Sequence, residues 1–136
     1  VVSQLPRMKE VCSQLGDSNI RVSLFIDADM KQIDAAMACG APVIEIHTGH
    51  YADAVSSVER ELKYNEIKKA CKYAHNLGLQ VNAGHGLTLE NTFAIAKIDS
   101  IIELNIGHSI ISRAVFVGLA NATTEMKALM LEARGL

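Results

Sequence analysis

The sequence has 136 residues, 49% of them hydrophobic, so it is long enough to bury one core and is unlike a disordered or fibrous protein. Its formal net charge of −2 combines 13 basic and 15 acidic residues that are mixed along the chain, which argues against nucleic acid or an anionic membrane surface as a partner. No apolar run approaches the roughly 20 residues needed to span a bilayer, and the first residues lack the pattern of a signal peptide.

Three cysteines, Cys12, Cys39 and Cys71, lie far apart within apolar helical patterns. An odd number of such cysteines is typical of reduced, buried thiols rather than of a disulfide framework. Because no membrane or export segment is recognisable either, we expect a cytoplasmic protein.

The first part of the sequence predicts a helix followed by a strand, a helix and a second strand. Apolar residues at helical spacing predict a helix over residues 5–15, with Gly16 as its end. Residues 21–27 are rich in β-branched and aromatic residues and alternate, which predicts a strand, whereas residues 30–39 repeat apolar positions at helical spacing. The second strand is predicted at residues 42–47.

The same alternation continues to the end of the sequence. A loop is followed by a long helix that ends at Gly78, and one face of this helix carries Leu62, Ile67, Ala70, Cys71, Ala74 and Leu77. Further strands are predicted at residues 79–83 and 101–106, with a helical stretch at residues 89–97 between them. Two more helical stretches follow the last strand.

Alternating strands and helices predict an α/β fold of parallel βαβ units, either an open doubly wound sheet or a β/α barrel. One face of the strands is apolar and suited to packing under helices; it carries Val22, Leu24, Ile26, Ile44, Ile46, Leu79, Val81, Ala83, Ile102, Leu104 and Ile106. The other face carries polar groups from all four strands, as in the lumen of a (β/α)8 TIM barrel, a fold of ~250 residues. We therefore expect one domain, residues 1–136, holding only the last four βα units of such a barrel.

Two glycine-histidine loops follow the third and fourth predicted strands. His85 stands between Gly84 and Gly86, and glycine on both sides removes steric cover and lets the backbone approach a ligand. Gly107 precedes His108 at the start of a helical stretch. In β/α barrels, the loops after the last two strands and the N-terminus of a short extra helix often bind phosphate. The two loops therefore predict a phosphate site.

Longer motifs resemble one known family. The segments LFIDAD, IEIHTGHYADA, VNAGHGLT and ELNIGHSIISRAV, and the ending MKALMLEARG, are similar in order and spacing to the C-terminal half of the pyridoxine 5'-phosphate synthases, which close the vitamin B6 ring. The resemblance covers essentially the whole chain and implies a β/α barrel with extra helices. It also implies condensation of 3-amino-2-oxopropyl phosphate with 1-deoxy-D-xylulose 5-phosphate, with release of phosphate and water, and no metal or organic cofactor.

The resemblance implies roles for five residues. His85 matches the family's proton donor, and imidazole exchanges protons near neutral pH. Glu45 matches a carboxylate that stabilises charge in the transition state; the alternative for Glu45 is a structural salt bridge. Gly86, Gly107 and His108 match contacts to the amino-oxopropyl phosphate, although the ring of His108 could instead cap the neighbouring helix.

Three other residues are not assigned to the site. Asp27 and Asp29 follow a strand, where an aspartate is more often the N-cap of the next helix than a ligand. His75 lies late in a helix and is expected at the surface.

A rival hypothesis is a metal-dependent aldolase or epimerase. Imidazoles and a carboxylate at one barrel rim would suit zinc or manganese. The ligands would come from His47, His50, His85, His108 and Glu45.

A third hypothesis is an inactive fragment. In the family, the first half of the chain supplies a general-base histidine and most contacts to the pentulose phosphate, and this sequence has no match to those motifs. A half-barrel also exposes two unpaired strand edges, which favours pairing or aggregation. We therefore expect the chain to be joined to an N-terminal half or to pair with another copy, and the intact enzyme to be a symmetric homo-oligomer.

Overall fold

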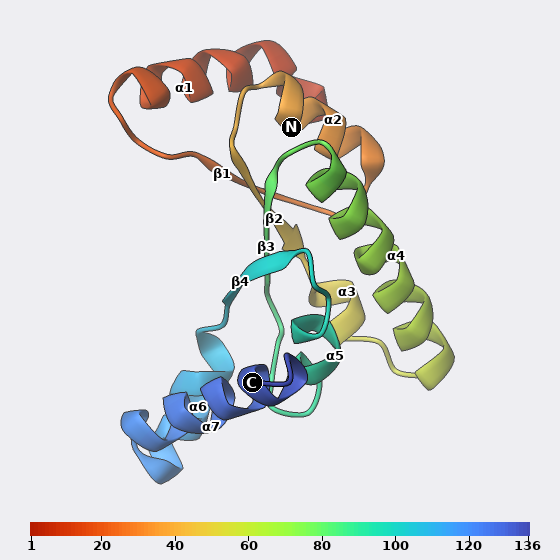
Figure 1. The fold of residues 1–136 in the computed structure, drawn as a ribbon, viewed down its shortest axis with the longest axis vertical. Coiled ribbons are helices and arrows are strands. Elements are labelled where there is room, and N and C mark those ends of the chain that lie inside the picture. Colours follow the sequence, from red (N-terminus) through yellow and green to blue (C-terminus); the bar gives the residue numbers. More distant parts are fainter.

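The computed structural model describes all 136 residues and contains four strands and eight helices, one of them a 3₁₀ helix (Figure 1). The strands are β1 (Ser23–Ile26), β2 (Val43–His47), β3 (Gln80–Gly84) and β4 (Ile101–Asn105). The helices are η1 (Val2–Gln4), α1 (Leu5–Asp17), α2 (Met30–Ala38), α3 (Gly49–Ala52), α4 (Ser57–Asn76), α5 (Thr92–Ala96), α6 (His108–Val117) and α7 (Leu119–Ala133). All the expected elements are present, and the short helices η1 and α3 are additional.

Local sequence signals set several of the helix ends. The Asp29 side chain caps α2 by accepting a hydrogen bond from the Gln32 N–H at 3.0 Å, so the N-cap expected for Asp29 is confirmed. Gly78, with a φ of +86°, follows the last turn of α4 in the left-handed conformation that favours glycine. Gly16 does not end the first helix, because α1 continues through it to Asp17.

The four strands form one parallel sheet in the order β1-β2-β3-β4, so neighbours in the sequence are neighbours in space. Figure 1 shows α2 and α4 along one side of this sheet, with α1 at one end of the molecule and α6 and α7 at the other. An open doubly wound sheet reverses its strand order at a switch point. These four strands contain no such reversal.

The apolar face of the sheet and the helices that cover it form the core. A cluster of 21 buried residues includes Leu24, Ile26, Ile44, Ile46, Val81 and Ala83 from the strands, as expected. Helices α2 and α4 contribute Ile33, Ala36, Ile67, Ala70, Cys71 and Ala74 to the same cluster. Burying each leucine, isoleucine or valine of this cluster contributes roughly 1.5–3 kcal/mol, so this face anchors the sheet under its helices.

Two residues expected in the core are exposed. Ile102 is 68% exposed because the pairing of β3 with β4 skips it: Val81 pairs with Ile101 and Asn82 pairs with Glu103. This irregularity moves the buried position from Ile102 to Ile101. Leu62 is 59% exposed, since it precedes Ile67 by five positions and therefore lies off the stripe of residues spaced by three and four.

Hydrogen bonds cross the polar face of the sheet from one side to the other. Arg21 donates to Gln80 at 2.6 Å, Gln80 to Asn82 at 3.0 Å, and Asn82 to Glu103 at 3.0 Å. These contacts join the segment before β1 to β3 and β4. The polar face predicted from the alternation is therefore present and internally bonded.

The three cysteines are free and buried, as expected from their helical positions. Burial raises the pKa of the Cys71 thiol to about 12. No helix combines the length and the apolar character needed to cross a membrane.

Two helices follow the last strand, as expected, and they contact each other. Arg113 of α6 lies 2.9 Å from Glu125 of α7, and this pair raises the pKa of Arg113 and lowers that of Glu125. Helix α6 contributes no buried residue, and Val115 and Phe116 are largely exposed. Apolar side chains of this helix therefore remain at the surface of the chain.

Candidate functional site

A cavity of about 420 Å³ brings together all five residues that the sequence assigned to the site. Glu45 comes from β2, His85 and Gly86 from the loop after β3, and Gly107 and His108 from the junction of β4 and α6. The other lining residues are Phe25, Leu87, Thr88, Asn105, Ile106 and Ser109. The loops converge because the carboxyl ends of parallel strands meet at one edge of the sheet.

His85 has a backbone conformation that L-residues rarely adopt. Its φ is +84°. The left-handed region costs a non-glycine residue roughly 1–2 kcal/mol, so the surrounding structure must hold this loop in shape. The exposed imidazole lines the cavity beside two other rings, with centroid distances of 4.8 Å to His47 and 6.4 Å to Phe25. The strained turn therefore presents an accessible ring.

The buried side chain of Thr48 holds the His85 loop. Its hydroxyl lies 2.7 Å from the backbone oxygen of Gly84 and 2.6 Å from that of His85. The Thr48 N–H also donates to the Gly84 oxygen, at 2.8 Å. Sequence reasoning missed Thr48, although its position directly after β2, at the rim where the loops meet, marks a residue that can bind a neighbouring loop.

Replacing Thr48 with valine is expected to lower the free energy of unfolding by about 1–3 kcal/mol, because the shielded carbonyl oxygens lose their hydroxyl donor. Urea denaturation of the purified chain, followed by circular dichroism, measures the loss. Thr48→Ser keeps the hydroxyl and is the matched control, which should retain most of the stability. Unchanged stability of Thr48→Val, or a loss in Thr48→Ser as large as that in Thr48→Val, would contradict the role of these hydrogen bonds.

Helix α3 packs closely against the same loop. A Cβ on Gly86, whose φ is +75°, would lie 2.7 Å from the Cβ of Ala52 in α3. The Tyr51 hydroxyl of α3 donates to the Asn91 backbone oxygen at 2.8 Å, and burial raises the pKa of Tyr51. Gly86 is thus required by internal packing as well as by its backbone conformation. The prediction that Gly86 serves only to let a ligand approach the backbone is therefore incomplete.

Glu45 is half-buried and bonded to the neighbouring strand end. Its Oε2 accepts a hydrogen bond from the Asn105 Nδ2 at 2.7 Å, which fixes the direction of the carboxylate. A Cβ on Gly84 would lie 2.6 Å from the Glu45 Oε1 and 2.7 Å from the Asn105 backbone oxygen. Gly84 is not among the residues that line the cavity. Its role is to leave room for Glu45.

The start of α6 forms the far wall of the cavity. Gly107 is the N-cap of this helix and offers no side chain to its free N–H groups. The space around its Cα is open, since a Cβ there would meet nothing within 4 Å. His108 and Ser109 of the first turn also line the cavity. Free N–H groups at a helix N-terminus favour an anion.

The histidines of the rival metal hypothesis separate into two groups. His47 and His50 cluster with Asp27, whereas His85 and His108 line the cavity described above. Asp27 does not cap a helix; its Oδ1 lies 3.3 Å from the Nδ1 of His47. The five proposed ligands therefore do not form one metal shell. His75 is exposed, as expected.

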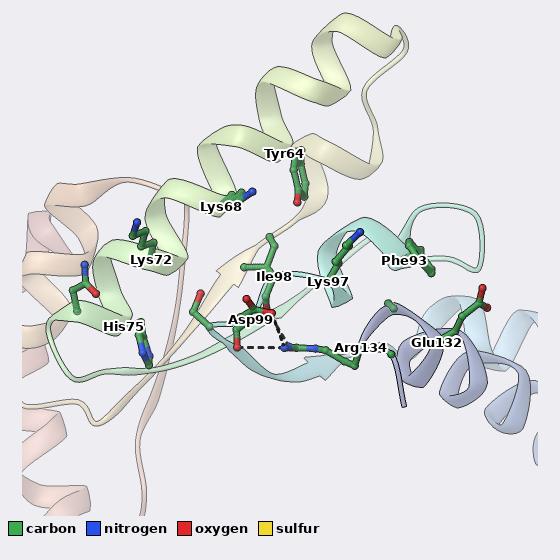
Figure 2. Close-up of a pocket in the computed structure, with 14 residues that line it drawn as sticks. Tyr64, Lys68, Lys72, His75, Phe93, Lys97, Ile98, Asp99, Glu132 and Arg134 are labelled. Carbon is green, nitrogen blue, oxygen red and sulfur yellow. Dashed lines mark hydrogen bonds and ion pairs between the residues drawn. The ribbon is translucent and has the colours of Figure 1, made fainter.

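A larger cavity, of about 920 Å³, contains none of the expected site residues (Figure 2). It lies between α4, which presents Lys68 and Lys72, and the end of α7, where Arg134 stands. Arg134 donates to the backbone oxygens of Ile98, at 3.1 Å, and Asp99, at 3.3 Å. The guanidinium therefore ties the end of α7 to the segment that leads into β4.

The structure is that of an α/β protein with a parallel sheet, and the smaller cavity lies at the carboxyl ends of its strands, where proteins of this class bind their ligands. The cavity combines a histidine, a carboxylate and an uncapped helix N-terminus. Residues 1–132 match the sequence model of the family described as pyridoxal phosphate biosynthesis protein PdxJ, and the chain belongs to this family.

One relative shows how much of a family member is present. The chain is 54% identical over 134 residues to the pyridoxine 5'-phosphate synthase of Photobacterium profundum. The alignment covers 98% of this chain and 55% of that protein. The chain therefore spans little more than half the length of the relative that it matches.

Proposed function

We propose that this chain forms the C-terminal half of a pyridoxine 5'-phosphate synthase and supplies one side of its active site. The reaction condenses 3-amino-2-oxopropyl phosphate with 1-deoxy-D-xylulose 5-phosphate to give pyridoxine 5'-phosphate, phosphate and water. The observation that carries the proposal is the single cavity lined by Glu45, His85, Gly86, Gly107 and His108. Membership of the family and the name of the relative support it.

We propose that the complete protein is a (β/α)8 barrel in which this sheet provides the last four strands. The sheet has one apolar face under helices, one polar face without them, and two outer strands, β1 and β4, that each pair on one side only. A barrel removes such edges by closing the sheet. The relative contains a further part that this chain does not cover. In the proposed barrel, strands from that preceding part of the same polypeptide pair with the free edges of β1 and β4.

The phosphate of the amino-oxopropyl substrate is assigned to the wall formed by α6. The N-cap glycine leaves the first-turn N–H groups without a side-chain acceptor, and a phosphate dianion would accept from them. The open space at Gly107 allows an oxygen to approach the backbone. Gly86 lies across the same cavity, on the loop that carries His85.

His85 and Glu45 are assigned to proton transfer and charge stabilisation. The imidazole of His85 can donate a proton to an oxygen that leaves as water or phosphate. The carboxylate of Glu45, held by Asn105, provides a fixed negative charge beside cationic intermediates of the condensation. Because the carboxylate is already oriented, little reorganisation accompanies the reaction.

A chimera tests this proposal. The uncovered N-terminal part of the Photobacterium profundum synthase is joined to this chain, and formation of pyridoxine 5'-phosphate is measured by chromatography. The unsubstituted chimera is expected to be active and to remain active after chelator treatment. Glu45→Gln keeps the hydrogen bond to Asn105 but removes the charge, and should lower kcat by about 10²-fold.

Three results would contradict parts of the proposal. A folded chimera without activity would show that this chain does not complete the synthase. Absence of ring closure together with a zinc- or manganese-dependent aldolase or epimerase activity would favour that class instead. Equal activity of the Glu45→Gln chimera would remove the role assigned to that carboxylate.

A further inference from the structure

We propose that Asp27, His47 and His50 form a binding site for a divalent transition metal, with zinc as the best fit. One potential ligand atom from each of the three side chains lies within 4.8 Å of the other two. Asp27 follows β1, His47 ends β2, and His50 lies in α3. The ends of two neighbouring strands and the helix that follows β2 therefore place nitrogen and oxygen ligands around one point.

The distances suit a tetrahedral ion with small adjustments. Ligands bonded to zinc at about 2.0–2.2 Å in a tetrahedron lie roughly 3.3–3.5 Å apart. The Nδ1 of His47 and the Oδ1 of Asp27 are already 3.3 Å apart. The ring of His50 stands 5.5 Å from that of His47, centroid to centroid, at 80°.

The side chains that must move are free to do so. Asp27 and His50 are both exposed, and the Asp27 side chain retains 65% of its accessible surface. Rotation of these two side chains needs no displacement of the core. His47 is less exposed than Asp27, and its ring lies 4.8 Å from the ring of His85, centroid to centroid. His47 therefore provides the fixed ligand.

The ligand set selects the class of metal. Two imidazoles and one carboxylate suit zinc and similar transition metals, whereas magnesium and calcium prefer oxygen ligands. Asp29 and Glu66 line the same cavity of about 310 Å³ and add negative charge. The only lysine there, Lys63, is paired with Glu66 at 2.9 Å. The surroundings therefore favour a cation.

The metal site is separate from the residues assigned to the synthase reaction. His85 lies beside His47 but lines the other cavity, and the Glu45 carboxylate is bonded to Asn105. Metal binding can be measured on this chain without any assay of catalysis. Failure of the metal proposal would therefore leave the proposed function untouched, and the reverse also holds.

The test titrates the purified chain with zinc in competition with a chromophoric chelator. We expect one bound ion per chain and a melting temperature that rises with zinc. Loss of partners outside the metal shell already weakens metal binding about 10–100-fold, so loss of a ligand in His50→Ala should weaken it by about 100-fold or more. Asp27→Asn should also weaken binding, while His75→Ala, which removes an exposed histidine of α4, should not.

Cobalt in place of zinc identifies the ligands. Tetrahedral nitrogen and oxygen ligation gives visible d–d bands, and these should disappear in His50→Ala. A thiolate charge-transfer band would instead assign the ion to a cysteine and overturn the proposal. So would absence of zinc binding to the folded chain, or unchanged affinity in both His50→Ala and Asp27→Asn.

Discussion

Replacing His85 with glycine is expected to lower kcat of the chimeric synthase by about 10²–10⁴-fold, the usual contribution of a positioned acid or base. The same change should leave the chain as stable as before or make it more stable by up to ~1 kcal/mol. The reason is the φ of +84°, which glycine adopts without steric cost. Steady-state kinetics of the chimera and urea denaturation of the chain measure the two effects.

His85→Asn is the companion variant, because asparagine tolerates the left-handed region better than most residues but cannot donate a proton as imidazolium does. It should be inactive and folded. Substantial turnover in either variant would show that another group donates the proton. A large loss of stability in the glycine variant would show that the His85 ring has a structural role.

Gly84→Ala is expected to lower the free energy of unfolding by about 1–3 kcal/mol, the range for overpacking a buried site. The added Cβ would lie 2.7 Å from the Asn105 backbone oxygen, which belongs to a paired strand and cannot move aside cheaply. It would also lie 2.6 Å from the Glu45 Oε1 and displace the carboxylate. The chimera should therefore lose activity as well, which kinetics and denaturation of the same preparation would show.

Gly16→Ala is the matched control for this substitution. A Cβ on Gly16 meets nothing within 4 Å, and the residue lies in the last turn of α1. Alanine is favoured over glycine in a helix by roughly 0.5–1 kcal/mol, so this variant should be unchanged or slightly more stable. If Gly84→Ala behaved in the same way, the close approach of β4 and Glu45 to β3 would be contradicted.

Periodicity in the sequence predicted the order and type of the main elements because the burial of most strands and helices is regular. The alternation in residues 42–47 placed Ile44 and Ile46 in the core and Glu45 on the polar face, and the structure agrees. The glycine-histidine loops were predicted to meet at one site because parallel strands end at the same edge of a sheet. His85 and His108 do line one cavity.

Features that depend on contacts across the sheet could not be obtained from periodicity. The position of Ile102 depends on an extra residue in β4 that no repeat in the sequence marks. The need for Gly84 arises from Asn105, which is 21 positions away, whereas the local sequence indicates only that glycine lets a ligand approach. Thr48 acts through backbone oxygens of another loop, and any residue supplies such oxygens. The residue types in the sequence therefore do not reveal the hydrogen-bond partners of Thr48.

The extra residue in β4 also affects which strand this edge of the sheet can join. An irregularity of this kind increases the local right-handed twist and bends the strand. Natural sheets use such twisted edges to prevent indiscriminate addition of foreign strands. We therefore expect the outer edge of β4 to pair with a strand of matching curvature and to disfavour a flat strand from another molecule.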